Sequence, residues 1–213
     1  MFRKKIKFIQ RVFKYLFLPK KYTILVATEP EILGKMHKFR YEKYCLEHHF
    51  LNADDYRDAT EHDLYDDNSV HIVACDEQKN VVGMLRLIFA AKTKLPTEHE
   101  YYIEKKLAPL NRSEIVEVSR FVVDKKYKGF FVSLDLLKFA FFYSKNNNIF
   151  YWVGTIESWL YDYTKRMFGE VEIIADKKFI FNTWNYPFLL NLLEIERKLK
   201  KTKPLIAFLF LKK

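Results

Sequence analysis

The chain has 213 residues, of which 49% are hydrophobic, 17% aromatic and 30% charged, which is ample material for one large folded domain. This composition, with only five glycines, argues against a disordered chain. The net charge of +10 belongs to the ends, because residues 1–21 hold eight Lys or Arg and residues 197–213 hold seven, with no acid in either stretch. The middle has 22 basic against 27 acidic residues and no groove-reading motif, which excludes a typical nucleic-acid-binding protein.

The two cysteines, Cys45 and Cys75, have no metal-ligand spacing. We expect each to be a small buried residue in a reducing compartment, and the protein to be cytoplasmic. The N-terminal stretch is interrupted by charge and lacks the apolar core of a signal peptide. No stretch reaches the apolar length of a membrane span.

Residues 1–20 place apolar side chains among lysines at nearly helical spacing, which predicts a basic amphipathic helix. Three interpretations remain open for this helix. It lies on the anionic inner face of a membrane, it docks an acidic partner protein, or it packs on the core with its lysines solvated.

The remaining elements follow in chain order as a strand, a helix, an acidic loop, a β-hairpin, and then alternating strands and helices. Strands are predicted at 21–28, 69–76, 81–90, 114–124 and 149–156, with two short ones in 170–184. Helices are predicted at 30–48, 99–107, 131–146, 157–169 and 187–201. This order predicts an α/β fold with a mixed central sheet and helices on both faces. We expect a main domain over 21–185 and a C-terminal helix and tail, 186–213, packed on it.

Charged residues stand inside two strands that otherwise read as apolar. Arg86 lies in "GMLRLIF", and Glu117, Ser119 and Arg120 lie in "IVEVSRFVV". Glu117 and Ser119 are two residues apart and share one face of the strand, so Arg120 is expected to point to the other face. Because a buried charge is costly unless it is paired, the pattern predicts a buried polar cluster, either a structural ion pair or a functional site.

The acidic block "EHDLYDDNSVH", residues 61–71, holds four carboxylates within seven positions. It is either a solvated loop or half of a site for an amine. His62 and His71, taken with Asp63 and Asp66, match no strong metal signature, so no metal site is predicted.

Four motifs occur in order and at compatible spacing over about residues 25–150. They are "KFRYEKYCLEHHF", "EHDLYDDNSVHIVA", "VVGMLRLI" and "EVSRFVVDKKYKG". Together they resemble the acyl-homoserine-lactone synthase family and its relatives, the N-acyl amino acid synthases, which are branches of the GNAT acyltransferase fold. The resemblance implies that the chain is an acyltransferase with a GNAT-like sheet.

The resemblance also implies roles for individual residues. Glu117 would be the general base for the attacking amine, directly or through a water, with Arg86 and Ser119 as further catalytic residues. The substrate-binding residues would be Arg40, Tyr44, Phe50, Asp63, Asp66 and Arg120. Arg40 and Arg86 would form a charge cluster with Asp63 and Asp66 that shapes the amine site. Ser119 and Arg120 would support the acyl thioester or its phosphopantetheine arm.

The donor implied by the resemblance is an acyl-phosphopantetheine thioester, with no tightly bound cofactor. The pyrophosphate loop of the fold survives only as "KYKGFF", in which Gly129 is present but Phe131 replaces the second small residue. This favours an acyl carrier protein over coenzyme A as the donor. A carrier protein is acidic and would be attracted to the basic ends of the chain. The apolar residues 131–142, in the helix predicted over 131–146, would line an acyl pocket or pack in the core.

The function predicted is transfer of a fatty acyl group from an acyl-carrier-protein thioester to the amine of a small molecule, with an amino acid favoured. Three alternatives remain open. They are a lactone synthase that uses S-adenosylmethionine, an acyl-CoA-dependent N-acyltransferase, and a catalytically silent GNAT-like domain that binds lipid or membrane.

Overall fold

The computed structural model describes residue 15 and residues 19–127, 130–169 and 171–212. Gly129 of the pyrophosphate loop lies outside the described residues, as does the predicted N-terminal helix except for Tyr15, Pro19 and Lys20. The strands are β1 Tyr22–Val26, β2 Ser69–Asp76, β3 Val81–Phe89, β4 Ile115–Val123, β5 Tyr151–Glu157, β6 Glu172–Ile173, β7 Lys178–Ile180 and β8 Thr183–Asn191. The α-helices are α2 Pro30–Tyr41, α3 Pro96–Tyr101, α4 Glu104–Leu107, α5 Phe130–Asn146, α6 Ser158–Phe168, α7 Leu192–Thr202 and α8 Pro204–Leu211.

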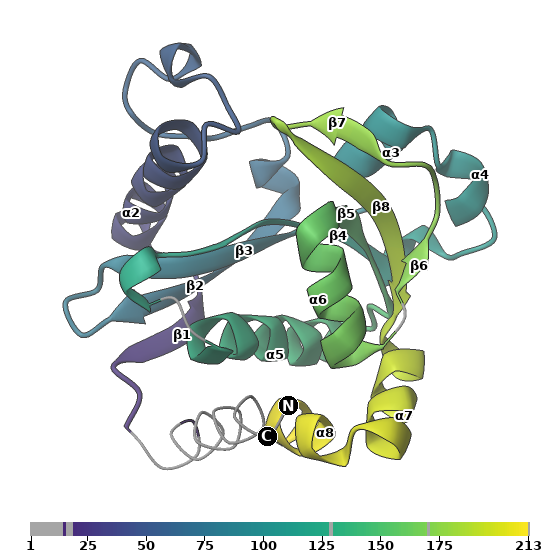
Figure 1. The fold of residues 1–213 in the computed structure, drawn as a ribbon. Helices are drawn as coiled ribbons and strands as arrows, with labels where there is room; N and C mark the ends of the chain where they lie inside the picture. The colour runs from purple at the N-terminus through teal and green to yellow at the C-terminus, as the bar shows by residue number, and fades with distance from the viewer. Residues whose placement is uncertain (1–14, 16–18, 128–129, 170, 213) are drawn as a thin grey trace.

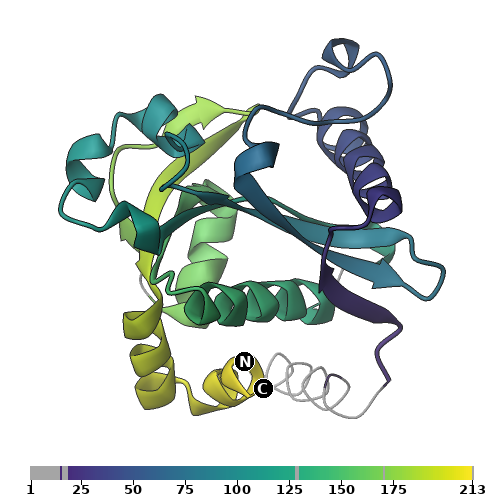
Figure 2. The ribbon, with the colours of Figure 1, turned by 180° about the vertical axis from the view of Figure 1, so that it is seen from behind.

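The strands form one mixed sheet in the order β1-β2-β3-β4-β5-β8-β6, with β7 paired to β8. Every neighbouring pair is antiparallel except β4 and β5, which run parallel. Helices α5 and α6 cover one face of the sheet, whereas α2, α3 and α4 lie on the other (Figures 1 and 2). This arrangement confirms the predicted fold class.

The sheet opens between its two parallel strands. β4 and β5 pair only where Ile115–Glu117 face Tyr151–Val153. Beyond these positions β4 continues alongside β3 and β5 continues alongside β8. The two strands therefore diverge just after Glu117, and main-chain groups line the opening between them.

The two faces of the sheet are packed differently. On the α5 side, a large apolar core joins the sheet to α5, α7 and α8. On the opposite side there are two smaller cores, one beneath α2 and one beneath α3 and α4. Cys45 and Cys75 are both buried and unpaired, as predicted. Among the residues that the structure describes, no helix combines the length and the apolar character that crossing a membrane requires.

Three predicted helices differ in their details. The short helix predicted over 99–107 is two helices, α3 and α4. The helix predicted over 30–48 is α2 continued by a π-helical turn, Glu42–Glu47. The helix predicted from Pro187 is wrong in its first five residues, which belong to β8. This apolar run gains ladder hydrogen bonds and burial by pairing with β5. The helix begins only at Leu192, where the Asn191 side chain accepts a hydrogen bond from the Glu194 N–H and caps it.

Candidate active site

A β-bulge in β4 places two consecutive polar residues on one face. Arg86 lies opposite Ser119 and Met84 lies opposite Val122, so Leu85 alone faces both Arg120 and Phe121. Arg120 takes the left-handed conformation, with φ 51°, at this extra position. The expectation that Arg120 points away from Ser119 is therefore wrong, because the bulge cancels the alternation and turns Arg120 to the α2 side.

The centre of the site is a fully buried carboxylate held by two arginines. Glu61 and Arg40 both have 0% of their surface exposed. Arg40 donates from Nε and Nη2 to the two oxygens of Glu61, at 2.5 and 2.8 Å. Arg120 donates to the same two oxygens, both at 3.0 Å. These paired contacts fix the geometry of both guanidinium groups.

Arg86 joins this centre to the acidic block and to β4. Its Nη1 donates to Asp63 at 2.7 Å and to Asp66 at 2.5 Å, and its Nε donates to the hydroxyl of Ser119 at 3.0 Å. Asp66 also accepts from Arg40 at 2.8 Å, and Asp63 accepts from Arg120 at 3.0 Å. The acidic block is thus bound to the sheet at this point and is not a freely solvated loop.

This charge cluster holds three guanidinium groups and three carboxylates, so its formal charges cancel. Burial alone would raise the pKa of Glu61, but Arg40 and Arg120 override it and lower the pKa to about 2. Burial likewise opposes ionisation of Asp66, yet Arg40 and Arg86 hold the pKa of Asp66 well below its usual range. All three carboxylates therefore form ion pairs with arginines. Asp63, whose side chain is 21% exposed, is the most accessible of them.

An aromatic wall closes one side of the cluster. The guanidinium of Arg120 lies 5.2 Å from the centre of the Tyr44 ring, which itself lies 5.8 Å from the ring of Phe50. Burial raises the pKa of Tyr44 to about 12, so the phenol stays neutral. Tyr44 belongs to the π-helical turn, and its carbonyl accepts the Phe50 N–H at 2.8 Å, which fixes the segment that carries both rings.

Glu117 lies two residues along the strand from Ser119 and on the same face, where β4 and β5 begin to diverge. The side chain is buried and accepts a hydrogen bond from the Thr97 N–H at 2.9 Å. Burial raises the pKa of Glu117 to about 7, against the lowering effect of that N–H. Glu117 can therefore gain or lose a proton near neutral pH, unlike the clamped carboxylates beside it.

Helix α3, which contacts Glu117 through Thr97, is held in place by the ion pair between Arg112 and Glu98. Arg112 donates to both carboxylate oxygens of Glu98, at 2.8 and 3.1 Å, and to the carbonyl of Ala90 at 2.9 Å. Glu98 also accepts the Leu95 N–H at 2.8 Å and so closes the first turn of α3. These contacts hold the Thr97 N–H against Glu117.

His71 borders the charge cluster without joining it through a close hydrogen bond. Its Nε2 lies 3.8 Å from Asp66, and burial lowers the pKa of His71 to about 4. The imidazole is therefore neutral at physiological pH. No described residue accepts from or donates to its Nδ1.

The structure brings together the residues that the motifs singled out. Hydrogen bonds and ring contacts link eight of them into one network, and Glu117 adjoins it along β4. The eight are Arg40, Tyr44, Phe50, Asp63, Asp66, Arg86, Ser119 and Arg120. Two participants were missed, namely Glu61 and Thr97. Charge balance could have found Glu61, because three arginines require a third carboxylate, whereas nothing in the sequence indicates the Thr97 main-chain contact.

Residues 39–138, which include this site, match the model of the acetyltransferase (GNAT) domain. No curated protein matches the chain. The fold resembles that of BjaI, a CoA-dependent acyl-homoserine lactone synthase solved with SAM and isopentyl-CoA, with a TM-score of 0.66 and 18% identity over 89% of this chain and 99% of that chain.

Two further solved structures share the fold. The AHL synthase LasI gives a TM-score of 0.66 and 19% identity, covering 82% of this chain and 91% of that chain. FeeM, an N-acyl amino acid synthase from uncultured soil microbes, gives 0.64 and 17%, covering 84% and 94%. These similarities confirm the resemblance predicted from the motifs. The domain match over residues 39–138 and the shared GNAT fold together indicate an acyltransferase.

Proposed function

We propose that the protein transfers a fatty acyl group from the phosphopantetheine thioester of an acyl carrier protein to the amine of a small molecule, with an amino acid as the acceptor. The observation that carries this proposal is Glu117. A buried carboxyl group whose pKa is raised to about 7 stands where the sheet opens, beside a rigid charge cluster. A general base with a pKa near the working pH is what deprotonation of an attacking ammonium requires.

In the proposed reaction, Glu117 takes a proton from the ammonium group of the acceptor, directly or through a water. The free amine attacks the thioester carbonyl, so the new N–C bond forms and the carbonyl oxygen becomes an oxyanion. Main-chain N–H groups along the opening between β4 and β5 stabilise that charge. The C–S bond then breaks as the nitrogen loses its second proton, and the leaving thiolate takes up that proton to give the free phosphopantetheine thiol. Glu117 returns the first proton to solvent. No covalent acyl-enzyme is required.

The charge cluster would position the two substrates. Because Arg40, Arg86 and Arg120 are each held by at least one carboxylate, they form a rigid wall of fixed charge. Asp63 and Asp66 would face the acceptor amine, whereas Ser119 and Arg120 would face the thioester. Tyr44 and Phe50 would supply the apolar side of this space.

The choice of donor rests on residues near the start of α5. Phe131 stands where a second small residue of the pyrophosphate loop is expected, which disfavours close approach of a coenzyme A pyrophosphate. The basic ends of the chain complement an acidic carrier protein. BjaI, however, is a CoA-dependent synthase solved with SAM, so acyl-CoA and S-adenosylmethionine are the alternatives that an experiment must separate.

The test compares lipid extracts of cells that express the wild type, Glu117→Gln, or the matched control Glu100→Gln by mass spectrometry. Glu100 is an exposed carboxylate on α3. We expect an N-acyl amino acid with the wild type and the control, and its loss by a factor of about 100 or more with Glu117→Gln. Equal product from all three would remove Glu117 from the mechanism, and an acyl lactone would replace the amino acid acceptor with S-adenosylmethionine.

The donor is tested with purified protein. Acyl carrier protein and coenzyme A charged with the same acyl chain are supplied in turn with the acceptor that the extracts identify. We expect turnover with the carrier protein and a much lower kcat/KM with the CoA thioester. The reverse preference would overturn the choice of donor and leave acyl transfer itself in place.

A further inference from the structure

The far end of the molecule, formed by α7 and α8, exposes a surface that the acyl-transfer site does not use. We define the α7–α8 face by its exposed residues on these two helices and the turns beside them. They are Leu193, Arg197, Lys201, Leu205, Phe208 and Lys212. In both views α8 lies beyond α5 at one end of the molecule, and α2 and α3 lie at the other (Figures 1 and 2).

Helix α8 is apolar on every side, yet two of its large apolar side chains are exposed. Ile206, Leu209 and Phe210 are buried in the core on the α5 face of the sheet. Leu205 and Phe208 point away from that core and are 44% and 46% exposed. A helix that is apolar all round is normally buried on all sides. The exposed side of α8 is therefore expected to bind a partner protein or a membrane.

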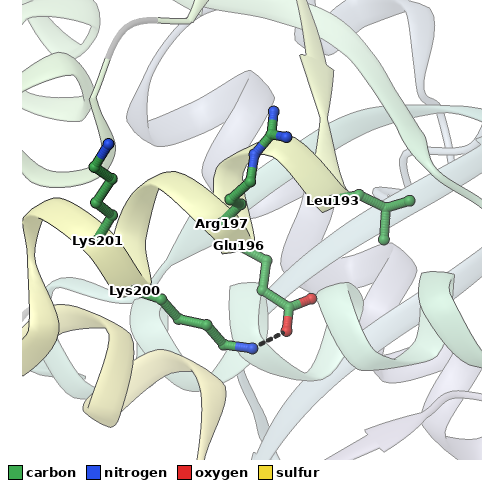
Figure 3. Close-up of a pocket in the computed structure, with 5 residues that line it drawn as sticks. All are labelled: Leu193, Glu196, Arg197, Lys200 and Lys201. Carbon is green, nitrogen blue, oxygen red and sulfur yellow. Dashed lines mark hydrogen bonds and ion pairs between the residues drawn. The ribbon is translucent and has the colours of Figure 1, made fainter.

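Basic residues precede and follow these two apolar side chains in the sequence. Residues 197–213 contain seven Lys or Arg and no acid. Figure 3 shows Arg197 and Lys201 extending to one side of α7, while Lys200 turns to the other side and pairs with Glu196 at 2.7 Å. Neither Arg197 nor Lys201 forms an ion pair within the part of the chain that the structure describes. The amine of Lys212 lies 5.0 Å over the ring of Phe208.

We propose that the α7–α8 face docks the protein on an anionic lipid bilayer. Leu205 and Phe208 enter the interfacial region, and the basic residues of the face contact lipid phosphates. Insertion of apolar side chains and attraction of basic residues to anionic headgroups are the two contributions on which such binding depends. A bilayer can deform around apolar side chains at the end of the molecule. An acidic partner protein would instead need an apolar pocket of matching shape for Leu205 and Phe208.

Docking in this way has a consequence for the candidate active site. Because α2 and α3 lie at the opposite end of the molecule, the protein would meet the bilayer with its α7–α8 face while the charge cluster stays on the aqueous side (Figure 1). A water-borne carrier protein would then still reach the site.

The test is co-sedimentation of the full chain with vesicles of phosphatidylcholine alone or mixed with phosphatidylglycerol. We expect binding to the mixed vesicles only, weakened by added salt. Leu205→Ser with Phe208→Ser should lower the partition coefficient at least about tenfold. The matched control is Leu46→Ser with Phe179→Ser, a leucine and a phenylalanine that are 51% and 59% exposed elsewhere, and it should bind as the wild type does.

A second pair of substitutions tests the charges without touching the apolar residues. Arg197→Gln with Lys201→Gln should weaken binding by about fivefold for each charge removed. Thermal melting of each variant establishes that it folds.

Three results would overturn the proposal. They are no binding of the wild type to the mixed vesicles, equal binding to neutral vesicles, and wild-type binding by the Leu205→Ser/Phe208→Ser variant. Capture of an acidic carrier protein by this face, without vesicle binding, would assign the face to that partner instead. None of these outcomes depends on acyl transfer, so the proposed function is tested separately.

Discussion

Glu117 is the residue at which function and stability oppose each other. Its carboxyl group has an ordinary pKa of 4.5, which burial raises to about 7 in the folded protein. Between these two values the folded state holds the proton more tightly than the unfolded state, so the free energy of unfolding falls as pH rises from about 4.5 to about 7. The total loss is up to about 3 kcal/mol, from the size of the shift.

Glu117→Gln should remove this dependence, because an amide carries no charge at either pH. We expect the variant to match the wild type near pH 4.5 and to exceed its stability by up to about 3 kcal/mol at pH 8. Urea unfolding at both pH values measures the difference, with Glu100→Gln as the control. A difference that is the same at both pH values would mean that folding does not raise the pKa of Glu117.

Glu61 presents the opposite case, a buried charge that stability requires. Removing its charge by Glu61→Gln leaves Arg40 and Arg120 without their shared partner, which should lower the free energy of unfolding by about 3–5 kcal/mol. The control is Asp67→Asn, since Asp67 is an exposed acid of the same block. Urea unfolding at pH 7 compares the two variants, and equal stability would show that Arg40 and Arg120 find other partners.

At the level of residues, the sequence indicates which residues form the candidate site better than it indicates how their side chains are arranged. Arg86 and Glu117 could be found because a charge within an apolar strand requires a partner. The roles of neighbouring acids could not be ranked, since a loop has no periodicity that shows which side chain turns inward. Glu61 is therefore the centre of the cluster although the motifs pointed to Asp63 and Asp66.

Among the elements, β4 shows where a sequence pattern misleads. The alternation of side chains predicts the strand correctly, but the bulge reverses the direction of Arg120. Nothing in the neighbouring sequence indicates the left-handed backbone of Arg120, because pairing with β3 and the contact with Glu61 fix this conformation. The start of α7 was misplaced for a similar reason, since pairing with β5 decides the state of an apolar run that would suit either structure.

The opening between β4 and β5 depends on a glycine at its base. A Cβ added to Gly154 would lie 2.7 Å from the Val118 carbonyl oxygen and 3.2 Å from the Phe188 ring. We expect Gly154→Ala to force β4 and β5 apart beside Glu117, lowering the free energy of unfolding by about 1–3 kcal/mol and reducing kcat as well.

Urea unfolding and steady-state kinetics measure the two effects of Gly154→Ala. The control is Gly34→Ala on α2, where an added Cβ meets nothing within 4 Å. There alanine should stabilise the helix by about 0.5–1 kcal/mol. Wild-type stability and kcat in Gly154→Ala would show that the strands accept the methyl group without moving.

On the scale of the whole molecule, the sheet divides into two arms. One arm contains β1–β4 and α2, and the other contains β5–β8 and α6. The arms join through the short β4–β5 pairing, and the Asn182 side chain of one arm donates to the His49 carbonyl of the other at 2.6 Å. Asn182 lies at the tip of the β7–β8 hairpin, which reaches the segment that follows the π-helical turn (Figure 1).

This second contact can be removed without disturbing the turn that carries it. Phe181 and Asn182 have φ 53° and 57°, the conformation of a type I′ turn, and glycine adopts it freely. Asn182→Gly therefore deletes the amide group alone, a hydrogen bond worth about 1 kcal/mol.

Amide hydrogen exchange in residues 178–186 should then become about fivefold faster in Asn182→Gly, because the tip of one arm is released from the other. Asn148→Gly is the matched control, since Asn148 also has a φ of 57° but occupies an exposed turn after α5. Exchange in the hairpin should be the same in Asn148→Gly as in the wild type. If Asn182→Gly leaves exchange unchanged as well, the hydrogen bond from Asn182 to His49 does not restrain the hairpin, and the other contacts between the two arms suffice.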